Sequence, residues 1–158
     1  MKKNPRIIAV CASVSHYPHL PEIQRELRSL GYKAILPKTA KKMIKSDNFS
    51  VEKHKAWYKD KSLYKIKTSL IKAHLKEIEK CDAILVANYE KNGLVGYIGG
   101  NVLIEMAAAF IGKKPIFILN PIDENLGIKE EVYGLNSIFL EGKLENITAR
   151  FKTKRYHS

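Results

Sequence analysis

The sequence is poor in cysteine, and it lacks any apolar run long enough to span a membrane, which takes about 20 residues. Its two cysteines, Cys11 and Cys81, each lie at the edge of an apolar run, without a CxxC pair or a cluster of histidines. Structural thiols are therefore predicted, ahead of a disulfide or a metal site. The start, MKKNPRIIAVCAS, does not have the pattern of a signal peptide, so we expect a cytoplasmic protein without membrane contact.

Two common nucleotide-binding motifs are also missing. The sequence contains neither GxGxxG nor GxxxxGK[ST], which disfavours dinucleotide-binding and P-loop proteins, and no cofactor is expected. It has no internal repeat, no low-complexity segment and no linker. With 158 residues the chain is expected to form one domain over residues 1–149, followed by a basic tail at 150–158 that we expect to be disordered around His157.

Positive charge, in contrast, is abundant and unevenly distributed. The net charge is +12, and residues 38–80 hold 13 lysines against 5 acids. Residues 81–149 are net negative, with 5 lysines against 9 acids, and this stretch contains the residues assigned below to the site. The basic residues are therefore predicted to lie apart from the site, either as a solvated face or as a surface for an anionic partner.

Short apolar runs alternate with helical patterns along the chain, which predicts strands and helices in turn. Helices are expected from Pro21 to Leu30, from Ser62 to Ile78 with His74 on the inward stripe, over Val102–Ile111, and near Leu144–Ala149. Residues 38–61 are expected to be a mobile loop with at most one short helix. The predicted strands are Arg6–Cys11, Lys33–Leu36, Asp82–Ala87, Pro115–Leu119 and Ser137–Leu140.

This alternation predicts an α/β fold, flavodoxin-like or Rossmann-like, with a parallel sheet of about five strands and helices on both faces. Ligands of such sheets bind at the carboxyl ends of the strands, beside the point where the strand order reverses. Two loops are placed to serve this edge, one at 12–17 after the first strand and one at 88–101 after the third.

The first loop offers hydroxyl groups and backbone N–H groups ahead of a helix. Ser13, Ser15, His16 and Tyr17 could hold a phosphate or a sugar hydroxyl there. A simple strand-to-helix turn explains the same residues equally well, so both interpretations stay open.

The second loop leads to an unusual carboxylate. Gly99 and Gly100 allow a ligand close to the backbone, Asn101 is predicted to cap the next helix, and Glu105 follows one turn later among small apolar residues. Burial would raise the pKa of Glu105, while the helix start would lower it and favour the ionised form. Such a carboxylate can serve as a nucleophile or a general base, and an exposed glutamate is the less favoured alternative.

The loop at 11–17, the run CDAILVANY and the glycine-rich turn before Glu105 and GKKPIFILN resemble nucleoside 2-deoxyribosyltransferases and the related deoxynucleoside 5'-monophosphate N-hydrolases. The similarity spans most of residues 6–140. It implies that Glu105 attacks the anomeric carbon of a nucleoside or nucleotide, that the loop with Ser13 and Ser15 holds the 5' end, and that neighbouring subunits of a homo-oligomer complete each site.

Two positions depart from this family. Relatives place an Asp that protonates or positions the base eight residues before the third strand's first Asp, where this chain has His74. An imidazole can be a general acid near neutral pH, but a structurally satisfied histidine is an equal alternative. In addition, Asn101, Val102 and Leu103 replace a glycine-spaced turn, and Asn101 could donate to a sugar hydroxyl. Further binding candidates are Tyr89 and Tyr97, which could stack on a base, and Asn120 at the end of GKKPIFILN.

Three functions therefore remain open. The favoured one is transfer or cleavage at an N-glycosidic bond, and a hydrolase of 5'-monophosphates is a close variant. The third is a non-enzymatic protein that binds nucleotides or nucleic acid, because Trp57, Tyr58 and Tyr64 are interleaved with lysines. His54, Trp57 and Tyr58 could also form a lid, but nothing in the sequence places them near Glu105.

Overall fold

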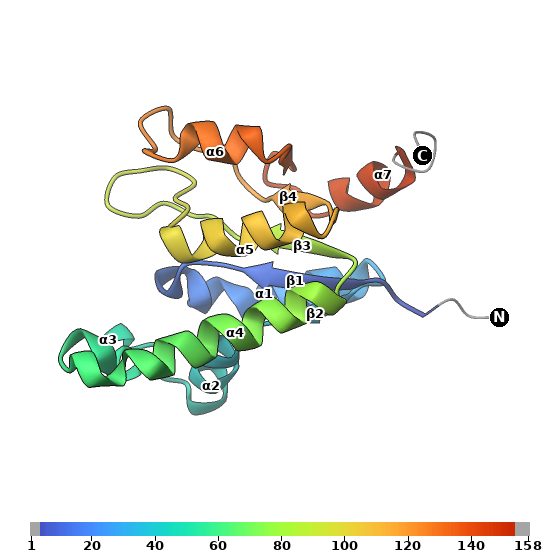
Figure 1. Ribbon diagram of the computed structural model, residues 1–158. Helices are drawn as coiled ribbons and strands as arrows, with labels where there is room; N and C mark the ends of the chain where they lie inside the picture. Colours follow the sequence, from blue (N-terminus) through green and yellow to red (C-terminus); the bar gives the residue numbers. More distant parts are fainter. Residues whose placement is uncertain (1–3, 154–158) are drawn as a thin grey trace.

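The computed structural model describes residues 4–153 and shows a parallel sheet of five strands in the order β2-β1-β3-β4-β5 (Figure 1). This is the flavodoxin-like order of a doubly wound α/β fold, as predicted. All four neighbouring pairs are parallel, with Ala9 opposite both Ile35 and Ile84. The strands are β1 (Ile7–Cys11), β2 (Lys33–Ile35), β3 (Ala83–Val86), β4 (Ile116–Ile118) and β5 (Ile138–Phe139).

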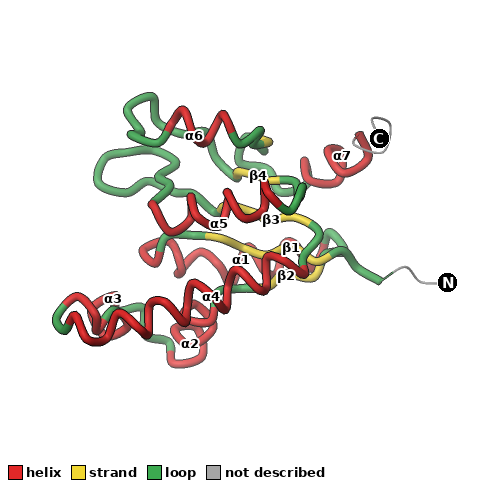
Figure 2. Tube along the Cα trace, in the orientation of Figure 1, coloured by secondary structure: helices red, strands yellow, loops and turns green. Residues whose placement is uncertain are grey.

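Helices connect the strands and cover both faces of the sheet, as Figure 2 shows for the whole trace. The α-helices are α1 (Leu20–Ser29), α2 (Lys38–Ser46), α3 (Val51–His54), α4 (Tyr64–Lys80), α5 (Gly100–Ile111), α6 (Lys129–Gly134) and α7 (Asn146–Thr153). Short 3-10 helices are η1 (Val14–His19), η2 (Ala56–Tyr58) and η3 (Lys61–Leu63).

The alternation of side chains along β1 divides the apolar interior into two clusters. Ile8 and Val10 point to the face covered by α1, α2 and α7. Ala9 and Cys11 point to the opposite face, covered by α4, α5 and α6. All four residues are fully buried. Since successive strand residues point to opposite faces, this periodicity places Cys11 on the same side as α4 and α5.

Residues 38–61 are more ordered than the sequence predicted. In place of a mobile loop with at most one short helix, this stretch forms α2, α3 and η2. Helix α2 is amphipathic, and its Ala40 and Met43 are fully buried. Ile44 is partly buried against the same core, so α2 has an apolar face that the surrounding lysines obscured in the sequence. Helix α6 was also missed, because its six residues bury Val132 alone.

Two smaller expectations about the helices are corrected. Gly99, not Asn101, is the N-cap of α5, and the helix begins at Gly100. Ile66, expected on the inward stripe of α4, is 43% exposed, while His74 and Ile78 on the same stripe are buried.

The last helix was predicted near Leu144–Ala149. The observed helix, α7, extends to Thr153, past the boundary at 150 where a tail was expected to begin. Phe151 explains the extension, because its ring contacts Phe117 edge-on at 5.2 Å and lies under the Arg6 guanidinium at 4.2 Å. The segment 154–158, including His157 with its predicted disorder, lies outside the described residues. Within residues 4–153, no helix combines the length and the apolar character needed to cross a membrane.

Candidate functional site

A pocket of about 340 Å³ lies at the carboxyl ends of β1 and β3, the two strands between which the sheet order reverses. Its lining comes from the segment after β1, from α2 to η2, from α4 and from the start of α5. The pocket therefore occupies the position where doubly wound sheets bind ligands, as the strand pattern predicted.

Glu105 reaches the pocket from the second turn of α5, and only 6% of it is exposed. The Asn101 side-chain amide, one helical turn earlier, donates to Glu105 Oε1 at 2.8 Å. The Lys67 ammonium in turn donates to Asn101 Oδ1 at 2.9 Å. Asn101 thus orients the carboxylate instead of capping the helix, and Lys67 orients Asn101.

Burial raises the pKa of the Glu105 carboxyl above its ordinary value. His74, the Cys11 thiol, Lys67 and Asn101 oppose this rise, because each favours the charged carboxylate. The result is a carboxylate that is desolvated yet surrounded by donors and a cation. A group of this kind is more nucleophilic than a fully hydrated one.

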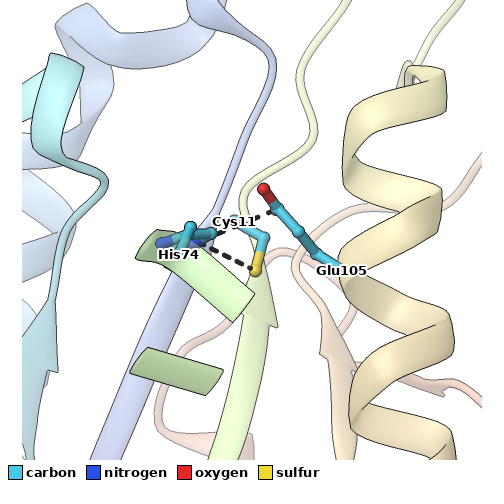
Figure 3. Close-up of side chains that lie close together, drawn as sticks. All are labelled: Cys11, His74 and Glu105. Atoms are coloured by element: carbon cyan, nitrogen blue, oxygen red, sulfur yellow. Dashed lines mark hydrogen bonds and ion pairs between the residues drawn. The ribbon is translucent and has the colours of Figure 1, made fainter. Parts of the chain in front are cut away.

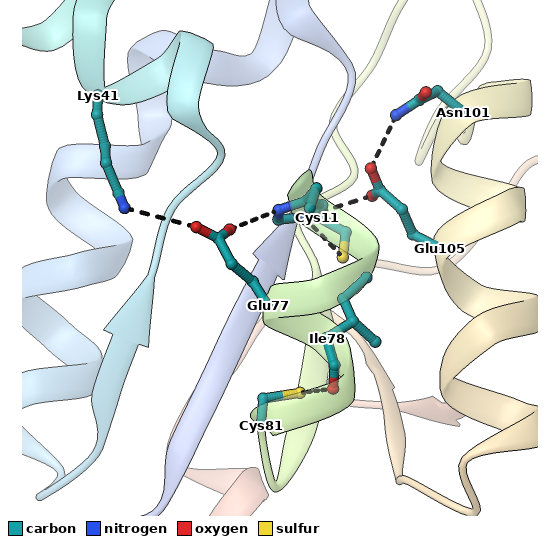
Figure 4. Close-up of polar contacts among 8 residues, drawn as sticks. Cys11, Lys41, Glu77, Ile78, Cys81, Asn101 and Glu105 are labelled. Carbon is teal, nitrogen blue, oxygen red and sulfur yellow. Dashed lines mark hydrogen bonds and ion pairs between the residues drawn. The ribbon is translucent and has the colours of Figure 1, made fainter. Parts of the chain in front are cut away.

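His74 projects from α4 toward Glu105, with its Nε2 at 3.8 Å from Glu105 Oε2 (Figure 3). Its Nδ1 lies 3.0 Å from Glu77 Oε2, one turn along the same helix. Lys41 from α2 faces the other oxygen of Glu77 at 3.9 Å (Figure 4). Both ring nitrogens therefore face carboxylates, so the ring orientation is fixed from two sides.

Cys11 completes this group and was not recognised as a site residue from the sequence. Its Sγ lies 3.7 Å from His74 Nε2, and the side chain is fully buried behind the pocket. Burial, together with the nearby Glu105 charge, raises the pKa of the Cys11 thiol well above its usual range. Its position as the last residue of β1 is the signal that could have placed it at the ligand edge. We call Cys11, His74 and Glu105 the floor.

Four lysines line the pocket, and they correct the expectation that the basic residues lie apart from the site. We call them the lysine rim. Three of them belong to the lysine-rich stretch 38–80, and the fourth follows β3. Among the described lining residues, Glu105 is the only acid. The lysine rim consists of Lys38, Lys55, Lys67 and Lys91.

Aromatic side chains form much of the remaining wall. Trp57, predicted to lie in a lid without a link to Glu105, is 5% exposed and lines the same pocket. Lys67 Nζ lies 5.9 Å from the centre of the Trp57 ring, and Lys91 Nζ lies 4.9 Å from that of Tyr97. His54 and Tyr58 also line the pocket, so all three residues of the proposed lid meet the site.

The structure gathers most, but not all, of the predicted site residues. Ser15 is exposed, and Asn120 pairs reciprocally with Asn88, holding β4 to the loop after β3. Ser15 and Asn120 lie outside the pocket lining, and so do His16 and Tyr89. The predicted residues that do line the pocket are Ser13, Tyr17, His74, Tyr97, Gly99, Gly100, Asn101 and Glu105.

His16 and Tyr89 lie outside the pocket lining and pack against other rings. His16 is 2% exposed and packs edge-on against Tyr89 at 5.6 Å between ring centres. Tyr89 stacks on His19 at 3.9 Å.

In the loop between β3 and α5, the position that requires glycine is Gly96. Its φ is +62°, and a Cβ there would lie 1.9 Å from the Pro121 carbonyl oxygen.

No known family model matches this chain, and no curated protein is detectably similar to it in sequence. The pocket has one desolvated carboxylate, two imidazoles and four lysines in its lining, and the Cys11 thiol lies beside His74.

Proposed function

We propose that the protein cleaves or transfers the N-glycosidic bond of a nucleoside or nucleotide through a covalent glycosyl-Glu105 intermediate. The observation that carries this proposal is the Glu105 carboxylate, buried at the base of a small-molecule pocket and oriented by Asn101 at 2.8 Å. The sequence resemblance to nucleoside 2-deoxyribosyltransferases assigns the nucleophile to the same residue.

In the first step a Glu105 oxygen forms a bond to the anomeric carbon, and the bond from that carbon to the base nitrogen breaks. The leaving base keeps the electron pair and takes up a proton. In the second step an acceptor, either water or a second base, attacks the same carbon and releases Glu105. Two successive displacements retain the configuration of the sugar, as in retaining glycosidases.

His74 is the proposed proton donor to the leaving base. When both ring nitrogens carry protons, Nδ1 can donate to Glu77, and Nε2 faces Glu105 and the pocket. Transfer of the Nε2 proton leaves a neutral ring that still donates to Glu77. This role would take the place of the Asp found in relatives.

The pocket suits a substrate of this class in size and wall chemistry. Its volume of about 340 Å³ falls at the lower end of the usual range for small-molecule sites. Trp57, Tyr17 and Tyr97 provide ring surfaces for a base or a sugar face. Asn101 uses one of its two amide N–H groups on Glu105, and the other could donate to a sugar hydroxyl.

A second candidate, hydrolysis of a nucleoside 5'-monophosphate, is favoured by the lysine rim. Four ammonium groups around one pocket exceed what a neutral nucleoside needs, and a phosphate would offset their mutual repulsion. Burial and the neighbouring Lys55 lower the pKa of Lys67, which is a sign of this crowding. Lys91 also contacts Ser13 Oγ at 3.4 Å, next to the proposed 5' end.

The same resemblance leads us to propose a homo-oligomer with shared sites. Helix α5, which carries Glu105, also exposes Ile104, Phe110 and Ile111 to 48%, 50% and 80%. Light scattering on the purified chain measures the number of subunits. A strictly monomeric chain with full activity would contradict the shared site.

The test is chromatography of reactions with a panel of ribo- and deoxyribonucleosides and their 5'-monophosphates, each with and without a free acceptor base. We expect base release or exchange for at least one member. The variant Glu105→Gln, which keeps an acceptor for the Asn101 amide, should lower the rate at least about 100-fold because the nucleophile is lost.

Glu124→Gln is the matched control, because Glu124 is exposed and pairs only with Lys129 at 2.8 Å among the described contacts. Full turnover in Glu105→Gln would show that the nucleophile is wrong. Tight nucleotide binding without base release from any substrate would favour the non-enzymatic alternative.

A further inference from the structure

The floor brings together three different metal-ligating side chains from separate elements. Cys11 ends β1, His74 lies in α4 and Glu105 lies in α5 (Figure 3). One ligand atom from each residue, a sulfur, a nitrogen and an oxygen, lies within 4.8 Å of the other two. All three side chains are buried, and nothing in the N-glycosidic mechanism requires the thiol.

Two of the three separations lie close to those around a tetrahedral ion. Bonds of about 2.3 Å to sulfur and about 2.0–2.1 Å to nitrogen or oxygen place the ligand atoms roughly 3.4–3.6 Å apart. In the structure, Sγ and Nε2 are 3.7 Å apart, and Nε2 and Oε2 are 3.8 Å apart. The third pair, Cys11 Sγ and a Glu105 oxygen, lies within 4.8 Å, so binding an ion requires the sulfur and this oxygen to approach each other.

The histidine ring is oriented as a metal ligand needs. Its Nδ1 lies 3.0 Å from Glu77 Oε2, and when the neutral ring carries its proton on Nδ1, the Nε2 lone pair faces Cys11 and Glu105. A carboxylate behind a histidine is the usual outer-shell partner at zinc sites. Lys41 faces the other oxygen of Glu77 at 3.9 Å, which keeps that carboxylate in place (Figure 4).

Charge balance explains how a buried site of this kind could accept a dication. Binding breaks the Cys11 S–H bond, forms a metal–sulfur bond and releases the proton to solvent. One thiolate and the Glu105 carboxylate then cancel the two positive charges, and the imidazole stays neutral.

We propose that the floor is a divalent-metal site in which Cys11 Sγ, His74 Nε2 and a Glu105 oxygen bind one zinc-like ion. The sulfur, nitrogen and oxygen donor set selects Zn²⁺ or Co²⁺ over Mg²⁺ and Ca²⁺, which prefer oxygen ligands. Glu105 and His74 line the pocket, so the fourth ligand position opens toward it. Water or a pocket ligand would fill that position.

The ion site depends only on this geometry, while its effect on turnover depends on the proposed function. An ion bound to Glu105 occupies the lone pair that would attack the anomeric carbon. It also occupies His74 Nε2, the proposed source of the proton. The metal-bound form is therefore inactive in N-glycosidic chemistry, and removal of the ion restores the nucleophile.

Binding is tested on the full-length chain without a histidine tag, by titration with Co²⁺ followed by competition with Zn²⁺. We expect one ion per chain, with strong tetrahedral visible bands and a thiolate-to-cobalt charge-transfer band. Cys11→Ser should abolish the charge-transfer band and weaken binding at least about tenfold. Cys81→Ser is the matched control, because the Cys81 thiol donates to the Ile78 carbonyl on the far side of α4's last turn, away from the floor (Figure 4).

Glu105→Gln provides a second variant that does not depend on the thiol and should also weaken Co²⁺ at least about tenfold. Absence of a thiolate band in the parent chain would overturn the site. An unchanged spectrum in Cys11→Ser, or loss of the band in Cys81→Ser alone, would overturn it as well. Because these readouts need no substrate, a lack of base release would contradict the proposed function and leave the ion site standing.

Discussion

The floor and the lysine rim of one pocket are built in opposite ways. The floor consists of three buried side chains, and His74 Nε2 lies 3.7 Å from Cys11 Sγ and 3.8 Å from Glu105 Oε2. The lysine rim consists of four side chains of the same charge that line one pocket. Lys67 links the two, because it belongs to the rim and holds Asn101, which holds Glu105.

This difference indicates which part of the site tolerates substitution. Each group in the floor sets the charge and orientation of the next, so a single substitution alters all of them. The rim acts through summed charge near solvent, where each lysine contributes a partial and screened share. Chemistry is therefore expected to depend on the floor, and affinity for an anion on the rim.

The largest effect is expected from His74→Ala in the floor. Loss of a general acid should lower turnover of ordinary nucleosides about 10²–10⁴-fold. Substrates with an N7-methylated purine, whose base leaves without protonation, should lose much less. Steady-state kinetics with both kinds of substrate measures the contrast, and His19→Ala serves as the control, because His19 stacks on Tyr89 outside the pocket lining. Equal losses with both leaving groups would remove His74 from the acid role.

A medium effect is expected from single substitutions in the rim, such as Lys55→Gln or Lys91→Gln. Each should raise KM for a 5'-monophosphate about tenfold, the equivalent of one charge-assisted contact, and leave KM for the unphosphorylated nucleoside nearly unchanged. The difference between the two substrates should shrink as salt concentration rises. Lys129→Gln is the control, since Lys129 pairs with Glu124 outside the pocket lining. Parallel changes for both substrates would show that the rim does not hold a phosphate.

The smallest effect is expected in the stability of Glu105→Gln. Burial raises the pKa of Glu105 in the folded state, so the folded protein binds this proton more tightly than the unfolded chain does. The ionised carboxylate is thus destabilising, with the full cost above the raised pKa and none below the ordinary value of an unfolded glutamate. The amide should therefore raise Tm at neutral pH by roughly 2–4 °C, what about 1 kcal/mol is worth in a domain of this size.

Thermal unfolding at neutral and at acidic pH measures this difference, which should disappear toward low pH. The activity should follow the same group in the opposite sense, since the nucleophile is lost as pH falls through the raised pKa. A Glu105→Gln protein that is less stable at every pH would mean that the carboxylate contributes to the fold instead of straining it.

Local patterns predicted much of the architecture. The five apolar runs and their spacing indicated a parallel sheet, and all five strands are present within a residue or two of the predicted limits. Helical spacing placed His74 on an inward face, and the apolar neighbours of Glu105 indicated that it is not a surface residue; both are buried. Helix α6 was missed because only Val132 among its six residues is buried, and α2 was missed because its short apolar face lies among many lysines.

Contacts between distant segments account for what the sequence could not predict. Asn101 was interpreted as a cap, but its neighbour Gly99 caps α5 and leaves the amide free to hold Glu105. Asn120, His16 and Tyr89 have residue types suited to binding, but the fold places them outside the pocket lining, where Asn120 pairs with Asn88 and the two rings pack against other rings. Residue type alone does not distinguish these uses.

The sequence by itself determined the positions of the five strands, the inward faces of α4 and α5, and a buried carboxylate after the third strand. These depend on periodicity and on neighbours along the chain, which the sequence states directly. Only the tertiary structure decided that Cys11 lies 3.7 Å from His74, 63 positions away, and that three lysines of 38–80 line the pocket from which they were expected to lie apart. The physical reason is that parallel strands bring their carboxyl ends to one edge, so residues far apart in sequence share a site.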